Sequence, residues 1–128
     1  MPELQCLIVE DDPSQAEIFS TALKQAGYAV TWIDHGGEAL SFLQNHAPHI
    51  VILDLHLPEV AGTDILRAIR EAPHLSATRV ILATADPRMA DTVAADSDLV
   101  LIKPVGYVQL RELARRLRPD DARSGENV

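Results

Sequence analysis

The segment LQCLIVEDDP, residues 4–13, decides the fold. Its apolar part, residues 4–9, predicts a buried strand, and three acidic residues follow at once: Glu10, Asp11 and Asp12. Carboxylates this close repel one another, and removing them from water is costly unless a cation lies among them. An oxygen-only cluster of this kind suits a hard divalent ion such as Mg²⁺. Asp12 before a proline also predicts a helix N-cap, so at this point a helix cap and a metal site both remain open.

Apolar runs alternate with helical patterns along the rest of the chain. Five runs predict strands, at residues 4–9, 28–33, 50–53, 80–83 and 99–102. The helical patterns between and after them carry apolar residues at i, i+3, i+4 and i+7, as in Leu110, Leu113, Ala114 and Leu117. This alternation implies βαβ units, in which helices cover both faces of a parallel sheet. Ligands of such sheets bind beyond the carboxyl ends of the strands, where the strand order reverses.

The composition is that of one small globular domain with an acidic surface. The chain has 128 residues, of which 47% are hydrophobic, and its net charge is -8. An excess of acids argues against nonspecific binding to nucleic acids or anionic membranes, which needs a basic surface. The single Cys6 falls inside the first predicted strand and is expected to be a small buried hydrophobe. The start, MPELQC, lacks the pattern of a signal peptide, so a cytoplasmic location is expected.

Polar side chains occur at the ends of four of the five predicted strands. Glu10 and Asp11 follow the first strand, and Asp54 ends the third. Thr84 ends the fourth strand, and Lys103 follows the fifth. Each has an ordinary explanation, such as a helix cap or a solvated charge, but all of them at one edge of a sheet are hard to obtain by chance. We therefore expect them to form one site.

The acids of this set predict a metal-assisted nucleophile. Asp54 is a carboxylate of the kind that forms aspartyl phosphates. Asp11 and Asp54 would hold Mg²⁺, Glu10 would contact it directly or through water, and the backbone carbonyl of His56 would add an oxygen.

The remaining members predict contacts to a phosphoryl group. Lys103 would place a positive charge beside one phosphoryl oxygen, and the Thr84 hydroxyl would donate to another. The backbone N–H groups of Leu55 and Ala85 are expected to complete the cradle. Phosphoryl transfer depends mainly on positioning and charge neutralisation, and this set offers both.

Four strings in order carry a family resemblance: LIVEDDP, VILDLHLPEVAG, ILATAD and LIKPV. Together they resemble the receiver domain of two-component response regulators, the CheY-like superfamily, over residues 4 to about 117. The resemblance implies an α/β, flavodoxin-like fold: a doubly wound, five-stranded parallel sheet of order 2-1-3-4-5. It implies one receiver domain over residues 1–118. The polar segment 119–128 is expected to be a disordered tail or the start of a linker.

The resemblance also implies a signalling role rather than an enzymatic one. Asp54 would accept a phosphoryl group from a phosphohistidine on a sensor histidine kinase or a histidine phosphotransfer protein, with autodephosphorylation afterwards. Glu10 and Asp11 would form the acidic pocket, Thr84 would be the switch hydroxyl, and Lys103 would bind the phosphate. The output would be altered contacts with an effector domain, a downstream protein or a second copy in a homodimer. Neither nucleic acid nor membrane binding is expected of this domain.

The chain departs from the family pattern at the output side. Receivers usually carry an aromatic residue three positions before the lysine, and this chain has Val100 there. The stretch from Thr84 to Lys103 is about three residues short, which predicts a shortened fourth helix around residues 87–95. We therefore expect an intact phosphorylation site with altered coupling from Thr84 to the usual aromatic switch.

Other residues near the motifs have weaker expectations. His56 and Asp86 lie at positions that influence acyl-phosphate lifetime in the family, and they are either solvated rim residues or neighbours across the site. Trp32, on the second strand, is expected to lie away from the site and to report poorly on metal binding. The other histidines are expected at the surface: His35, His46, His49 and His74.

Three alternative functions compete with phosphate acceptance. A flavin-binding module would need a Ser/Thr/Gly-rich loop after the first strand, and the acidic EDDP opposes a phosphate there. A phosphohydrolase with an aspartyl intermediate would carry a second acid where this chain has His56. A pseudo-receiver, regulating by protein contact without phosphorylation, is disfavoured by the complete site, but the departure at Val100 keeps it as the alternative.

Overall fold

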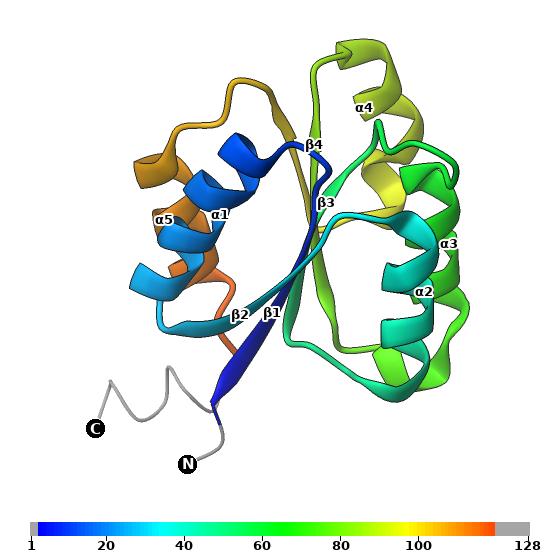
Figure 1. Ribbon diagram of the computed structural model, residues 1–128, viewed down its shortest axis with the longest axis horizontal. Helices are drawn as coiled ribbons and strands as arrows, with labels where there is room; N and C mark the ends of the chain where they lie inside the picture. The colour runs from blue at the N-terminus through cyan, green and yellow to red at the C-terminus, as the bar shows by residue number, and fades with distance from the viewer. Residues whose placement is uncertain (1–2, 120–128) are drawn as a thin grey trace.

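The computed structural model describes residues 3–119 as alternating strands and helices around one sheet (Figure 1). The strands are β1 (Leu4–Val9), β2 (Tyr28–Ile33), β3 (Ile50–Asp54), β4 (Arg79–Thr84) and β5 (Leu99–Ile102). The α-helices are α1 (Pro13–Gln25), α2 (Gly36–Asn45), α3 (Gly62–Glu71), α4 (Pro87–Val93) and α5 (Tyr107–Arg116). Short 3-10 helices span Pro73–Leu75 and Ala94–Asp96. The sheet order is β2-β1-β3-β4-β5 with all pairs parallel, which confirms the predicted architecture.

Helices cover both faces of the sheet. In Figure 1, α1 and α5 lie on one side of the strands, and α2, α3 and α4 lie on the other. Each face has its own core of buried aliphatic side chains, which explains why β3 is apolar without alternation. Cys6 is buried in the core beneath α1 and α5, as its place in the first strand predicts.

Local signals in the sequence define the start of α1, and the chain length between motifs defines the length of α4. The side chain of Asp12 accepts a hydrogen bond of 2.9 Å from the Ser14 N–H, and Pro13 is the first helical residue of α1. Asp12 is therefore an N-cap, as one of the two readings of the acidic cluster predicts. Helix α4 has seven residues against ten to thirteen in the other α-helices, so the predicted shortening is confirmed.

The register of the strands brings their carboxyl ends together. Val9, the last residue of β1, pairs with Ile33 on one side and Leu53 on the other. Asp54 pairs with Ala83, the residue before Thr84. Because all strand pairs are parallel, the loops after β1, β3, β4 and β5 begin at the same edge of the sheet. The strand order reverses at β1, and such folds bind ligands at this edge beside the reversal.

Within residues 3–119, no helix is long and apolar enough to span a bilayer. The segment expected as a tail, apart from Pro119, lies outside the described residues.

Candidate functional site

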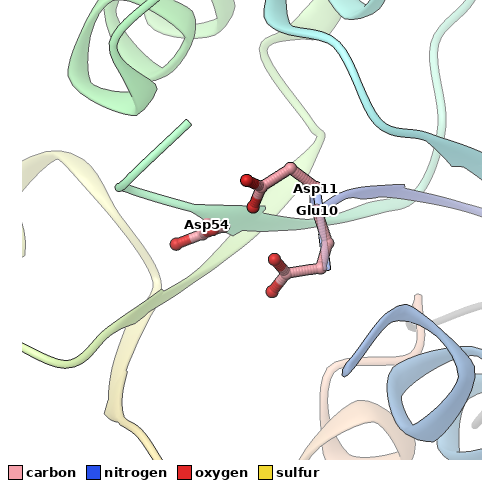
Figure 2. A group of neighbouring side chains, drawn as sticks. All are labelled: Glu10, Asp11 and Asp54. Atoms are coloured by element: carbon pink, nitrogen blue, oxygen red, sulfur yellow. The ribbon is translucent and has the colours of Figure 1, made fainter. Parts of the chain in front are cut away.

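Three carboxylates meet at the carboxyl edge of the sheet. Glu10 and Asp11 come from the end of β1 and Asp54 from the end of β3, and one oxygen of each lies within 4.8 Å of the others. Figure 2 shows the three side chains gathered between these two strand ends. Glu10 and Asp54 are only 1% and 2% exposed, whereas Asp11 is exposed. Two of the three charges therefore have little water around them.

A single lysine reaches this cluster from the loop after β5. Lys103 Nζ lies 3.1 Å from Glu10 Oε1 and 3.5 Å from Asp54 Oδ1. One ammonium beside three carboxylates leaves an excess of negative charge in a poorly hydrated place.

The pKa of Glu10 reflects both its burial and the negative charge around it. Burial raises it most, and the charge of Asp54 raises it further, while the N–H of Asp12 and the ammonium of Lys103 lower it. The outcome is a pKa raised from 4.5 to about 7. Near pH 7 the carboxyl is thus partly protonated, and a bound cation would take the proton's place.

The donor set fits a hard divalent cation. All three groups offer carboxylate oxygens, the ligand type that Mg²⁺ prefers, and no sulfur or imidazole competes. Within the described part of the chain, this is the one group of three or more acidic, histidine or cysteine ligands close enough to share an ion. The predicted contribution of the His56 carbonyl stays a prediction.

Thr84 is buried at the end of β4 and is hydrogen-bonded to residues of three loops. The Asp86 N–H donates to Thr84 Oγ1 over 3.0 Å, and His56 Nε2 lies 3.0 Å from the same oxygen. The backbone N–H of Lys103 donates to the Thr84 carbonyl over 2.8 Å. Thr84 therefore connects the loops that follow β3, β4 and β5. The sequence leaves two alternatives open for His56 and Asp86, and their contacts with one Thr84 hydroxyl agree with neighbours across the site, although the His56 side chain is also exposed.

One backbone prediction is wrong. The N–H of Leu55 donates to the Ala83 carbonyl over 3.1 Å, because the ladder between β3 and β4 continues one residue beyond Asp54. It is therefore not available to a phosphoryl group. The N–H that points at the Asp54 carboxylate is that of His56, which donates to Asp54 Oδ1 over 3.0 Å. The role predicted for the Ala85 N–H stays a prediction.

The expectation for Trp32 is also wrong. Its indole N–H donates to the Glu10 carbonyl over 2.7 Å, although the ring itself is 44% exposed. The parallel register pairs Ile8 with Trp32, and the Glu10 N–H continues the ladder by donating to the Ile33 carbonyl. The only tryptophan of the chain is thus attached to the acidic loop, which the register of β1 and β2 could have revealed.

Sequence reasoning missed the support beneath Asp54. A Cβ at Gly62 would stand 2.6 Å from both the Asp54 carbonyl oxygen and the Leu55 Cα, closer than any real Cβ contact. Glycine is therefore required here by close backbone approach, and it lets α3 begin directly under Asp54. The string VILDLHLPEVAG contains this glycine, but its spacing from Asp54 does not reveal the contact.

The remaining histidines do not join the site. Their rings bind other backbone or side-chain groups: His35 with Glu59, His46 with Phe42, His49 with Gln5 and His74 with Leu43. All four lie at or near the surface, in agreement with the prediction.

Comparison with known proteins places the chain in a family. The model of the response regulator receiver domain matches residues 6–115. The probable transcriptional regulatory protein TcrX of Mycobacterium tuberculosis is 34% identical over 95% of this chain, which spans 54% of that protein. The chain thus spans about half the length of TcrX.

Solved structures agree with this assignment. The chemotaxis response regulator CheY4 of Vibrio cholerae has a TM-score of 0.81 at 25% identity, covering 91% of this chain and 99% of that one. A BeF3-activated DrrB receiver domain has a TM-score of 0.80 at 28% identity, covering 91% and 97%. The chain therefore belongs to the response regulator receiver domain family.

Proposed function

We propose that Asp54 accepts a phosphoryl group from a phosphohistidine on a sensor histidine kinase or a histidine phosphotransfer protein. The observation that carries this proposal is the buried Asp54 carboxylate with Lys103 3.5 Å away and two further acids sharing its site. A receiver domain is a signalling domain, and its phosphorylation here would alter contacts with a partner protein. Autodephosphorylation would return it to the starting state.

The chemistry follows from the contacts of Asp54. Its Oδ1 accepts the His56 N–H and faces Lys103, so Oδ2 is the oxygen assigned to attack. The bond from Oδ2 to phosphorus forms as the bond from phosphorus to the donor imidazole breaks, and the imidazole nitrogen keeps the electron pair. Lys103, already in place, would neutralise one phosphoryl oxygen, and Thr84 would donate to another.

A divalent cation would be held by Glu10, Asp11 and Asp54, with the His56 carbonyl as a further ligand. Mg²⁺ bound there would supply the positive charge that lets an anionic phosphoryl group approach an anionic nucleophile. Glu10 would give up its proton to take part, since its pKa is raised to about 7.

Partners beyond the phosphodonor follow only from family likeness and charge. The net charge of -8 supports a domain that binds proteins rather than nucleic acid or membranes. An effector domain, a separate target or a second copy would each receive the signal. We also propose a cytoplasmic location.

The test of phosphate acceptance is direct. We expect incubation with Mg²⁺ and acetyl phosphate to add one phosphoryl mass to a peptide containing Asp54, and Asp54→Asn to abolish it. A wild-type protein that stays unmodified by acetyl phosphate and by a cognate kinase would contradict the proposal. That result would favour the alternative, a pseudo-receiver acting by protein contact, which the replacement of the usual aromatic residue by Val100 keeps open.

Metal binding can be followed through Trp32. Because its indole N–H is bonded to the Glu10 carbonyl, we expect Mg²⁺ to change its fluorescence. Asp11→Asn should weaken the apparent affinity at least about tenfold, since one of three anionic ligands is lost. An unchanged affinity in Asp11→Asn would contradict the metal assignment.

A further inference from the structure

The Thr84 hydroxyl already has partners in the unphosphorylated protein. His56, in the loop after β3, places Nε2 at 3.0 Å from Oγ1. The backbone N–H of Asp86, the N-cap residue of α4, donates to the same oxygen over 3.0 Å. The hydroxyl is thus held between the loop that carries the acceptor and the start of α4.

The hydrogen-bond inventory leaves two arrangements for these contacts. A hydroxyl has one proton and two lone pairs, and the Asp86 N–H already occupies one lone pair. With the His56 proton on Nδ1, Thr84 donates to His56 Nε2 at 3.0 Å; with that proton on Nε2, His56 donates to the second lone pair and Thr84 donates to the Asp86 carbonyl at 3.4 Å. The first arrangement gives the Thr84 proton the shorter contact.

We propose that His56 has its own proton on Nδ1 and accepts the hydrogen bond of the Thr84 hydroxyl at Nε2. His56 would then be a positioning residue that holds this hydroxyl away from Asp54 until a phosphoryl oxygen takes the place of Nε2 as its acceptor. This inference rests on the proposed function, because the competing acceptor is a phosphoryl oxygen on Asp54. Thr84 has a single proton to donate, so binding the phosphoryl oxygen requires breaking the bond to His56. His56 therefore sets how strongly the unphosphorylated state is favoured.

The same hydroxyl gives the signal a route to α4. The Asp86 side chain accepts the Arg88 N–H over 2.9 Å and caps the helix, while the Asp86 backbone N–H is bonded to Thr84. A shift of Thr84 toward Asp54 would loosen this N-cap and with it the first turn of a seven-residue helix. The route needs no aromatic ring, which fits the presence of Val100 at the usual switch position.

The hydrogen bond can be tested without phosphorylation. In ¹⁵N NMR of the histidine rings, we expect His56 to be in the neutral Nδ1–H form, with the Nε2 resonance shifted because this nitrogen accepts a hydrogen bond from Thr84. Thr84→Val keeps the shape and removes the hydroxyl, so it should move the His56 resonances and the Asp86 amide while leaving His46 unchanged. An Nε2–H form of His56, or His56 resonances that ignore Thr84→Val, would overturn the inference.

Competition is tested with beryllofluoride, a tetrahedral mimic of a phosphoryl group, in the presence of Mg²⁺. His56→Phe keeps a ring of similar size but cannot accept the Thr84 proton. Losing one hydrogen bond of ordinary strength from the unphosphorylated state should tighten beryllofluoride binding about fivefold. His46→Phe makes the same replacement at a ring stacked on Phe42, outside the site, and should leave the affinity unchanged.

The outcomes separate the two proposals. Equal or weaker beryllofluoride binding by His56→Phe, in a protein whose wild type does bind, would overturn the role of His56 alone. A wild type that neither binds beryllofluoride nor gains a phosphoryl mass from acetyl phosphate would overturn the proposed function and this inference with it. Tighter binding by His56→Phe together with the Nδ1–H form would support the inference.

Discussion

The carboxylates at the two ends of the sheet differ in how far neighbouring cations neutralise them. At the carboxyl end, Glu10, Asp11 and Asp54 share one lysine, Lys103. At the amino end, a single carboxylate, that of Asp98, is shared by two arginines. The first cluster has more negative than positive charge, whereas the second has more positive than negative charge.

The Asp98 cluster is the better satisfied of the two. Arg70 and Arg79 reach its two oxygens over 3.1 and 3.2 Å, and the Val80 N–H donates to it over 2.7 Å. Burial alone would raise the pKa of Asp98, but the Val80 N–H and the two arginines outweigh it, and the pKa is lowered. The pKa of Glu10 moves the other way, to about 7.

The difference distinguishes a structural charge cluster, around Asp98, from the cluster at the candidate functional site. Asp98 fastens the start of β5 to α3 and β4 with groups that the chain supplies itself. The acidic cluster leaves its negative charge to be balanced from outside, by a proton or a cation. Local conflict of this kind is expected at functional sites, where it persists because the rest of the fold is consistent. The predictions below test this contrast.

The largest loss of stability is expected at the amino end. Asp98→Ala removes the partner of two arginines and leaves the Val80 N–H without its hydrogen-bond acceptor. We therefore expect the free energy of unfolding to fall by about 3 kcal/mol. Urea denaturation measures it.

The matched control is Asp98→Asn, which keeps an acceptor for the Val80 N–H and should lose about half as much. At the other end Asp11→Asn, which removes an exposed charge from an overcrowded cluster, should not destabilise the metal-free protein. Equal losses at Asp98 and Asp11 would show that the two clusters do not differ as described.

Packing, rather than charge, is expected to stabilise the site end. Gly62→Ala would put a Cβ 2.6 Å from the Asp54 carbonyl oxygen and the Leu55 Cα, so the backbone under the acceptor must move. We expect a loss of about 2–3 kcal/mol and slower phosphorylation by acetyl phosphate. Gly37→Ala, where nothing lies within 4 Å of the added Cβ, is the control and should be neutral or slightly stabilising. Tolerance of both substitutions would refute the close approach of α3 to β3.

Removing the buried charge of Glu10 should raise the free energy of unfolding, whereas Asp98→Ala and Gly62→Ala should lower it. The folded protein holds the Glu10 proton up to a pKa of about 7, whereas the unfolded chain releases it near 4.5. Between these values the folded state binds more protons, so its stability falls as pH rises, and the penalty is complete above pH 7. Glu10→Gln should therefore gain about 1–2 kcal/mol at pH 8 without divalent cations and gain little at pH 4.

Thermal unfolding across this pH range, with EDTA present, measures the effect. Adding Mg²⁺ should stabilise the wild type more than Glu10→Gln, because the variant has lost an anionic ligand. A variant that is less stable than the wild type at pH 8 would show that the ion pair with Lys103 outweighs the cost of burial.

The positions of several of these residues could be predicted from the sequence, but some of their contacts could not. The positions of Asp54, Thr84 and Lys103 at strand ends follow from apolar runs, because parallel strands must end at one edge. The cap by Asp12 follows from the proline after it. These are local signals, or consequences of the topology that local signals imply.

The missed contacts depend on register and on long-range approach. Trp32 reaches Glu10 because β1 and β2 end level with each other, and Leu55 is engaged because the ladder of β3 and β4 runs one residue further. Asp98 accepts hydrogen bonds from residues 18 to 28 positions away in the chain. No local pattern encodes such distances.

The smallest effect is expected in the loop that leads from Asp54 to α3. Glu59 has φ of 70°, the one positive value found at a non-glycine residue in the described chain, and its ion pair with His35 is long and exposed. A left-handed backbone costs a side-chain-bearing residue roughly 1 kcal/mol, while an exposed pair contributes little. Glu59→Gly should therefore raise stability by about 1 kcal/mol, or the Tm by about 4 °C. Glu59→Ala removes the same charge without freeing the backbone and should give no gain. An equal gain from both would mean that charge, not backbone strain, limits stability beside the site.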